Sequence, residues 1–376
     1  MIPFNKPFIV GKELYYIAQS VMVDRQLSGN GIFTKKCQKW MEQRLGALKA
    51  LLTHSCTGAL EMAAILCDIE TGDEVIMPSY TFVSTANAFV LRGGVPVFVD
   101  IRRDTLNMDE KLIAAAITPR TKAIVCVHYA GVPCAMDAIL DIAKRHNLLV
   151  VEDAAQGFYS DYKGKMLGTL GDIGCLSFHE TKNIICGEGG ALLINNAEFK
   201  DRAEIIWEKG TNRKKFLRGE VDKYTWVDIG SSFLPSEQVS AFLYAQLELS
   251  ETIIENRRNT YKRYYERLAP LESQGCLELP GTQNENLSNG HMFYILTESF
   301  AERTNLIKAL AKDEIKAVFH YVPLHSSPAG RRFCRIHGGM DITDEISSRL
   351  VRLPLFFGMS DQDVDKVVEK IKGFYL

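Results

Sequence analysis

The residue of this sequence best suited to covalent chemistry is Lys182, which lies between an expected strand at 174–178 and the glycine-rich turn 187–190. A lysine held half buried beside a hydroxyl-bearing strand end has a lowered pKa, so its neutral amine can form a Schiff base with a carbonyl compound. An ordinary surface lysine is the simpler interpretation when the residue is taken alone. The residues that accompany it must therefore decide between the two.

A carboxylate is the second candidate. The apolar run 148–151 ends in Glu152-Asp153, where a buried parallel strand would reach its ligand crevice. Asp153 could protonate or orient a cofactor there, although a helix cap and a magnesium ligand are the commoner roles for an acid at a strand end. We expect catalytic roles for Lys182 and Asp153 together.

A third feature is the stretch 53–60, in which small and hydroxyl residues precede a helical pattern. Thr57 and Gly58 would place free N–H groups where a phosphate can accept hydrogen bonds. Pyridoxal 5′-phosphate needs a lysine for its aldehyde, an acid for its ring nitrogen and such a cradle for its phosphate. Ser55 or Thr57 capping a helix is an alternative compatible with this interpretation. Phe82, after an expected strand, could lie on the cofactor ring.

The elements that must position these residues alternate between short β-branched runs and helical patterns. Parallel sheets covered on both faces show this alternation, so we predict an α/β fold with a mainly parallel central sheet. A helix is expected to end at Asn147, after apolar residues spaced as on one helix face. The expected strands are 75–77, 95–99, 123–128, 148–152, 174–178 and 191–194.

The second part of the chain is predicted to be a smaller α+β domain. One long helical pattern runs from Pro235 to Pro270, which places the boundary between a large domain, 1–249, and a small one, 250–376. Strands are expected at 291–296 and 318–322, and Ser299 and Ser360 should cap helices. The long irregular region 209–235 is the kind of loop that usually carries function.

Composition excludes several classes of function. With 44 Lys and Arg against 46 Asp and Glu, the formal charge of −2 supplies no field for nucleic acid or an anionic membrane. No stretch approaches the roughly 18 apolar residues of a membrane helix.

The nine cysteines form no CxxC pair, so reduced core thiols are expected rather than disulfides or a metal site. Charged residues interrupt the N-terminal segment, so we expect no signal peptide and a cytoplasmic protein.

These residues resemble those of the DegT/DnrJ/EryC1/StrS family of sugar aminotransferases over nearly the whole chain. The resemblance is carried by IPFNKP (2–7), SCTGAL (55–60), PSYTFVSTANA (78–88), EDAAQG (152–157), SFHETKNIICGEGGA (177–191) and YVPLH (321–325). It implies the fold of aspartate aminotransferase (fold-type I), pyridoxal phosphate as the cofactor, and a homo-oligomer whose sites form between subunits.

The resemblance also implies roles for single residues. Lys182 would bind the cofactor's aldehyde and move protons, and Asp153 would pair with the ring nitrogen. Phe82 would stack on the ring, Gln156 would hydrogen-bond its phenolic oxygen, and Thr57, Gly58 and Ser177 would hold the phosphate.

Many members have Gly-Tyr-Asn-Tyr-Arg at 230–234, whereas this chain has Gly-Ser-Ser-Phe-Leu. Ser232 therefore replaces the Asn that reaches a neighbouring subunit's cofactor, and the missing Arg leaves the amino donor's carboxylate without a partner.

A narrower resemblance concerns the substrate. Residues 210–237 are similar to transaminases that form dTDP-4-amino-4,6-dideoxygalactose, which implies L-glutamate as donor and dTDP-4-keto-6-deoxyglucose as acceptor. Another keto sugar nucleotide and a non-catalytic sensor that keeps the fold are the alternatives. A sensor would be expected to lose Lys182 or Asp153, and a nicotinamide enzyme would need a GxGxxG turn after an early strand, which is missing.

The basic loop 209–223 is the expected site for the nucleotide. Arg213 and Lys215 could clamp its diphosphate, or could belong to a solvated basic turn. Ser28 and Tyr321 are weaker candidates for contacts with the sugar.

Overall fold

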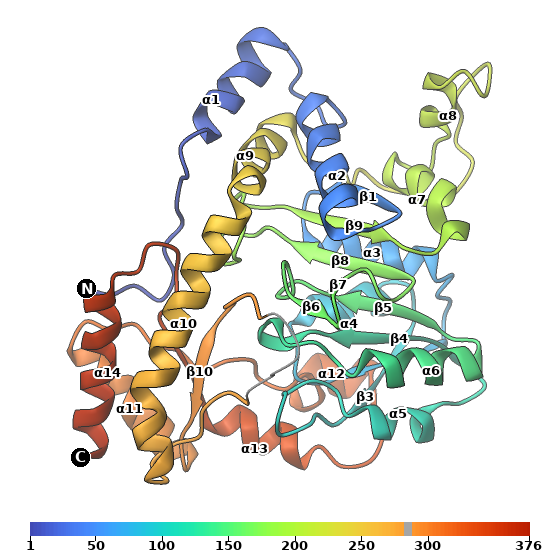
Figure 1. The fold of residues 1–376 in the computed structure, drawn as a ribbon. Coiled ribbons are helices and arrows are strands. Elements are labelled where there is room, and N and C mark those ends of the chain that lie inside the picture. Colours follow the sequence, from blue (N-terminus) through green and yellow to red (C-terminus); the bar gives the residue numbers. More distant parts are fainter. Residues whose placement is uncertain (282–287) are drawn as a thin grey trace.

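The computed structural model describes residues 1–281 and 288–376. Its centre is an eight-stranded sheet of strand order β1-β9-β8-β5-β4-β2-β3-β11 (Figure 1). The strands are β1 (Lys49–Thr53), β2 (Glu74–Pro78), β3 (Val95–Val99), β4 (Thr121–Val127), β5 (Leu149–Asp153), β8 (Ile173–Ser177), β9 (Gly190–Ile194) and β11 (Arg335–Ile336). The six strands expected for the large domain are all present, with ends shifted by at most two residues.

The sheet is mainly parallel, as predicted. Within the part of the chain that the structure describes, β9 alone runs antiparallel to both of its neighbours, β1 and β8. The central strands are buried along almost their whole length because helices cover both faces. The carboxyl ends of β2, β4, β5 and β8 therefore open at the same edge of the sheet.

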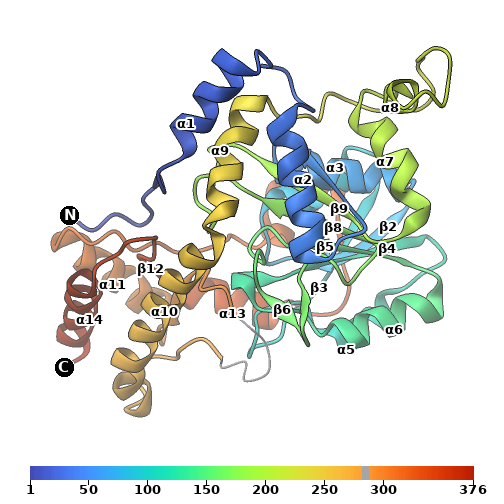
Figure 2. The ribbon, with the colours of Figure 1, turned by 45° about the horizontal axis from the view of Figure 1, so that its top comes forward.

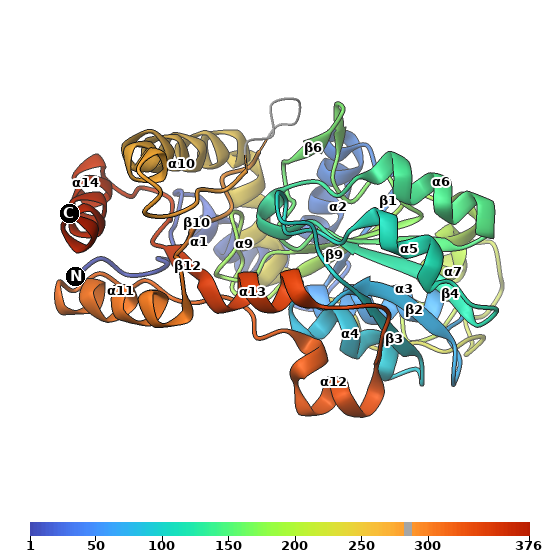
Figure 3. The same ribbon diagram turned by 90° about the horizontal axis from the view of Figure 1, so that it is seen from below.

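Each face of the sheet has its own apolar core. One face packs against α3 (Cys56–Leu66), α4 (Val83–Val90) and α7 (Lys200–Trp207). The other packs against α2 (Ile32–Leu45), α5 (Glu110–Ala116), α6 (Met136–His146) and α9 (Glu237–Glu248). Figure 3 shows these two layers on either side of the strands. Helix α6 ends where predicted, with Asn147 in the left-handed conformation that stops a helix.

The C-terminal part forms a separate core around a two-stranded sheet. Strand β10 (Phe293–Leu296) pairs antiparallel with β12 (Leu350–Leu353), and the surrounding helices are α10 (Ser250–Ser273), α11 (Phe300–Lys312), α13 (Asp341–Arg349) and α14 (Asp361–Tyr375). Ser299 and Ser360 cap α11 and α14 as predicted. The remaining helices and strands are α1 (Glu13–Ala18), a π-helical turn (Gln19–Val23), β6 (Asp161–Tyr162), β7 (Lys165–Met166), α8 (Arg213–Leu217), α12 (Pro328–Phe333) and three short 3₁₀ helices (Tyr129–Gly131, Ala197–Phe199 and Leu324–Ser326).

Two predictions about this part are wrong. Residues 318–322 are not a strand, because only Val318 bridges to β12 and the following residues turn toward the large sheet. The long helical pattern after Pro235 is two helices, α9 and α10, separated at Leu249. Pro270 lies inside α10 rather than at its end, since a proline near a helix terminus removes only one hydrogen bond of the last turns. The predicted domain boundary falls at the junction of α9 and α10.

A buried carboxylate joins α9 to the N-terminal helices. Glu237, at the first position of α9, accepts hydrogen bonds of 2.8 Å from the backbone N–H groups of Gly31 and Phe33 at the start of α2. The unpaired N–H groups and the dipole of a helix start stabilise a negative charge there. Figure 2 shows α1, α2 and α9 gathered at one end of the molecule.

Two absences hold for residues 1–281 and 288–376. No helix there is both long and apolar enough to cross a membrane. No three His, Cys, Asp or Glu side chains lie close enough together to hold a metal ion.

Candidate functional site

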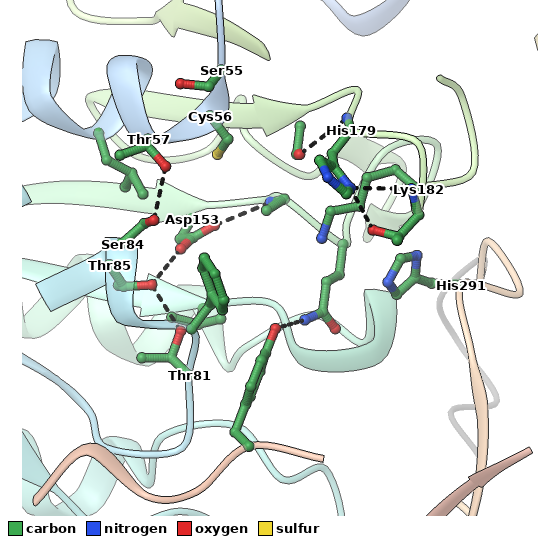
Figure 4. Close-up of a pocket in the computed structure, with 18 of the residues that line it drawn as sticks. Ser55, Cys56, Thr57, Thr81, Ser84, Thr85, Asp153, His179, Lys182 and His291 are labelled. Carbon is green, nitrogen blue, oxygen red and sulfur yellow. Dashed lines mark hydrogen bonds between the residues drawn. The ribbon is translucent and has the colours of Figure 1, made fainter. Parts of the chain in front are cut away.

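A cavity of about 510 Å³ opens at the carboxyl ends of the parallel strands (Figure 4). Its lining comes from the ends of β5 and β8, the first residues of α3 and α4, and the turn that carries Lys182. The C-terminal part adds His291, His320, Tyr321 and Arg352. The cavity therefore lies where open α/β sheets bind ligands, and both parts of the chain close it.

Lys182 is held by the turn after β8 and faces this cavity. The backbone N–H of Lys182 donates to the carbonyl of His179, and Cys186 returns a hydrogen bond to Phe178. Burial lowers the pKa of the Lys182 amine, an effect that the negative charge of Asp153 partly offsets. The amine makes no hydrogen bond with any residue in the described ranges. It is therefore free to react with a carbonyl group in the cavity.

Asp153 is fixed at the end of β5 by a chain of hydroxyl groups. Thr85 donates to its Oδ2 over 2.7 Å, and Thr81 lies 2.8 Å from Thr85 Oγ1. The N–H of Ala155 donates to Oδ1. Figure 4 shows Thr81, Thr85 and Asp153 in line at the cavity wall. This network holds the carboxylate toward the cavity. The sequence analysis missed Thr85, whose signal was the hydroxyl-rich run 79–85.

The preceding acid, Glu152, has a different role. Its carboxylate accepts hydrogen bonds from His128 Nε2 at 2.9 Å and from the N–H groups of Gly168, Leu170 and Gly171. Successive side chains of a strand point to opposite faces, so only one of the two acids can face the cavity. Glu152 stabilises the loop that precedes β8.

The start of α3 forms an anion cradle of backbone and hydroxyl groups. Ser55 caps the helix by accepting from the N–H of Gly58, and Thr57 Oγ1 lies 2.8 Å from Ser84 Oγ. Strand β9 begins directly against this turn, because a Cβ on Gly190 would lie 2.4 Å from the backbone nitrogen of Cys56. Ser177 completes the lining. This turn offers helix N–H groups and hydroxyls as hydrogen-bond donors, and the residues described there include no carboxylate. Such a turn suits a phosphate.

Gln156, Tyr321 and Phe82 lie around the same cavity. Gln156 accepts from the N–H of Ala130 over 2.7 Å and donates to the Tyr321 hydroxyl over 3.0 Å, so its amide is fixed in place. Phe82 is 54% exposed and its ring centre is 6.1 Å from that of Tyr321. A flat ring bound between Phe82 and the strand ends would cover this exposed face. The lysine, the acid, the hydroxyl groups and the aromatic ring around the cavity thus fit pyridoxal phosphate.

Five predicted site residues do not line the cavity of this chain. Gly58 lies behind the cavity wall at the start of α3, where its N–H donates to Ser55 Oγ. The others are Ser28, Arg213, Lys215 and Ser232. Arg213 pairs with Glu208 and Lys215 with Asp201, on a helix, α8, that projects from the body opposite the C-terminal part (Figure 1).

Sequence reasoning also missed residues that the C-terminal part brings in. His291 and Arg352 line the cavity although more than 100 residues separate them from Lys182. His291 Nδ1 lies 2.9 Å from Asn183 Oδ1, and Asn183 uses its amide nitrogen to donate elsewhere, so His291 carries its hydrogen on Nδ1. Burial and the neighbouring cations lower its pKa, which keeps the ring neutral. No local motif predicts such contacts.

The sequence model of the DegT/DnrJ/EryC1/StrS aminotransferase family matches residues 10–372. GDP-perosamine synthase of Escherichia coli O157:H7 is 31% identical over 100% of this chain and 98% of its own length.

Two solved structures are similar over the whole chain. The aminotransferase TlmJ from Streptoalloteichus hindustanus superposes with a TM-score of 0.90 at 27% identity, covering 100% of this chain and 98% of its own. Spr1654 from Streptococcus pneumoniae, in its PLP-form, has a TM-score of 0.88 at 25% identity over 100% and 98%.

Proposed function

Because the chain belongs to the DegT/DnrJ/EryC1/StrS aminotransferase family, we propose that it transfers the amino group of L-glutamate to the C4 keto group of dTDP-4-keto-6-deoxy-D-glucose. The products are dTDP-4-amino-4,6-dideoxy-D-galactose, a sugar precursor of enterobacterial common antigen, and 2-oxoglutarate. Family membership itself confirms a pyridoxal-phosphate-dependent sugar aminotransferase that acts on keto sugar nucleotides. The predicted fold class, enzyme class and cofactor are therefore correct, and the sensor alternative is excluded.

The observation that carries the proposal is the free amine of the half-buried Lys182 in one cavity with the fixed carboxylate of Asp153. Thr57 and Ser177 would hold the cofactor's phosphate at the start of α3, beside Gly58, whose own N–H donates to Ser55. Phe82 would cover its ring, and Gln156 would bond to its phenolic oxygen. Asp153 would keep a proton on the ring nitrogen through a charge-assisted hydrogen bond.

Bound pyridoxal phosphate supplies an aldehyde for the amino group and a ring that accepts electrons when a proton leaves the donor's α carbon. Lys182 would be the base at this point, since its amine would lie at the carbon from which the donor displaces it, and its lowered pKa favours the neutral form. It would take the proton from the donor and later return one to C4 of the sugar. Two separate half-reactions follow, so the kinetics should be ping-pong.

The choice of nucleotide rests on the resemblance of residues 210–237. GDP-perosamine synthase is named for a GDP-linked sugar, so another keto sugar nucleotide is the alternative substrate. Incubation with L-glutamate and either dTDP-4-keto-6-deoxyglucose or a GDP-linked 4-keto-6-deoxy sugar tests the choice, with the ring couplings of the amino sugar read by NMR. Conversion of the GDP substrate alone, or an equatorial amine, would contradict our assignment.

We further propose that the active enzyme is a cytoplasmic homo-oligomer. Arg213, Lys215, Ser28 and Ser232 lie outside the cavity of their own chain, so we assign them to a neighbouring subunit's site. Replacing Arg213 and Lys215 with Gln should raise the KM for the sugar nucleotide and spare the glutamate half-reaction. Equal damage to both halves would argue against a diphosphate clamp.

A further inference from the structure

Arg352 is a cavity residue without an anionic partner. It lies in β12 and lines the same cavity as Lys182 and His291. Its guanidinium makes no hydrogen bond or ion pair with any residue in 1–281 or 288–376, and its Nε is buried. The residue as a whole is half-buried, and arginines withdrawn from water are usually paired, because removing the charge from water is costly.

Arg257, which is fully buried, is held differently: its Nη1 also lacks a partner, but its other guanidinium nitrogens are bonded. Arg257 donates to the backbone carbonyls of Gly290, His291 and Leu355, which tie it to the C-terminal core. Arg352 instead has the ring of Phe4 at 4.7 Å from its guanidinium carbon. An aromatic face orients a guanidinium and leaves its N–H groups free for a ligand.

The charges around the cavity leave Arg352 uncompensated. The acids of the lining are Asp153 and Glu188. Asp153 is hydrogen-bonded by Thr85 and Ala155, and Glu188 lies 3.5 Å from His179 and is exposed. The other groups that interact electrostatically with Arg352 are the neutral hydroxyls of Tyr80, Tyr129 and Tyr321. The basic side chains Lys182, Arg257, His291 and His320 also lie near it, and none of them supplies a negative charge. Arginine cannot shed its proton at ordinary pH, so a ligand must supply the anion.

We propose that Arg352 binds a carboxylate of the amino donor, which deepens the proposed function and rests on it. The cofactor's phosphate would be held by the start of α3, whereas Arg352 comes from the C-terminal part. The donor reacts at Lys182, so its carboxylates must lie in the same cavity. A planar guanidinium matches a carboxylate with two parallel hydrogen bonds, which gives the donor a fixed orientation. Arg352 thus fills the role that the missing Arg at position 234 left open.

The test compares two variants of the cofactor-loaded enzyme, Arg352→Gln and Arg352→Lys. The glutamate half-reaction is followed by the change in cofactor absorbance, and the sugar half-reaction is measured separately from the amine-loaded form. We expect Arg352→Gln to raise the KM for glutamate about ten- to hundredfold and to leave the sugar half-reaction within about twofold. Arg352→Lys should recover part of the loss. Calorimetry should show glutarate binding weakened by the same factor.

Arg303→Gln is the matched control. Arg303 also lies over an aromatic ring, Phe300, and has a buried Nε without a partner, but it is outside the cavity. This variant should keep both half-reactions.

Three results are decisive. An unchanged glutamate half-reaction in Arg352→Gln would overturn the assignment, and so would a loss confined to the sugar half-reaction, which would place Arg352 on the nucleotide. Equal loss in both halves with a lowered Tm would make Arg352 a structural residue. If the wild-type enzyme reacted with no amino acid at all, the proposed function would fail instead, independently of Arg352.

Discussion

At the scale of single residues, burial and charge act in opposite directions on Lys182. Burial lowers the pKa of its amine from the usual 10.5, whereas the negative charge of Asp153 raises it, and burial prevails. The folded protein therefore favours the neutral amine, the form that reacts with an aldehyde. The same preference has a measurable effect on stability.

Replacing Lys182 with Met should stabilise the cofactor-free protein at pH 7. Below the lowered pKa, folding must bury a charged amine, and this cost disappears as the pH rises through the lowered pKa toward 10.5. The Tm of Lys182→Met should therefore exceed that of the wild type at pH 7, with the difference shrinking as the pH approaches 10. Turnover should fall by at least about 10²–10⁴-fold. Thermal melts of the cofactor-free proteins across pH test the effect on stability. A difference in Tm that stays constant with pH would exclude it.

Thr85 is a positioning residue for Asp153. Its hydroxyl donates to the carboxylate over 2.7 Å in a buried setting, where a hydrogen bond to a charged group contributes about 1.5–3 kcal/mol. Thr85→Val keeps the shape and should slow the glutamate half-reaction about tenfold, whereas Thr85→Ser should restore most of the rate. If the valine and serine variants were equally active, the hydroxyl would have no part in holding Asp153.

At the scale of elements, the close approach of β9 to α3 shapes the proposed phosphate cradle. Only a residue without a side chain fits at Gly190, because a Cβ there would meet the backbone of Ser55 and Cys56 at 2.4 Å. This close contact fixes the first residue of β9 against the first turn of α3, although the two lie far apart in the sequence.

Gly190→Ala should therefore push β9 and α3 apart. We expect a loss of about 1–3 kcal/mol in the free energy of unfolding, the usual cost of overpacking, together with weaker cofactor binding. Urea unfolding and titration with pyridoxal phosphate measure the two effects. Gly373→Ala is the control, since its Cβ would meet no atom within 4 Å in helix α14 and alanine favours a helix. Equal cofactor affinity in Gly190→Ala and the wild type would show that this contact does not shape the cradle.

At the scale of the whole molecule, large apolar side chains are exposed on the N-terminal helical segment and the loop after α8. Met22 is 75% exposed and Trp226 is 79% exposed. Exposed apolar clusters mark interaction surfaces, and a second copy of the chain is the partner that the proposed shared site requires.

We predict a homo-oligomer at micromolar concentration by sedimentation velocity. The double variant Leu14→Lys and Met22→Lys should shift it toward monomer and lower activity at least about tenfold, because the shared site would be incomplete. Leu376→Lys, at an 80% exposed position at the end of the chain, should change neither property. A fully active monomer would contradict the proposed sharing of Ser232 and Arg213.

The sequence by itself predicted the lysine suited to covalent chemistry, the hydroxyl-rich helix start and six strands of the large sheet. It predicted neither β1 and β11 nor the order in which the strands pair. The predicted features depend on short-range patterns, such as the alternation of β-branched runs with helices and the cap at Ser55. Local patterns failed at 318–322, where a β-like run turns toward the cavity instead of pairing along its length.

The tertiary structure gave the physical basis for the choice of Asp153, because Glu152 is bonded on the other face of β5. Only the tertiary structure decided that Thr85 holds Asp153 and that Arg352 lines the same cavity. The physical reason is that the cavity forms where two separately packed cores meet. Arg352 and Lys182 are far apart in the chain, and the packing of β12 and the C-terminal helices, rather than any local preference, brings them into one site.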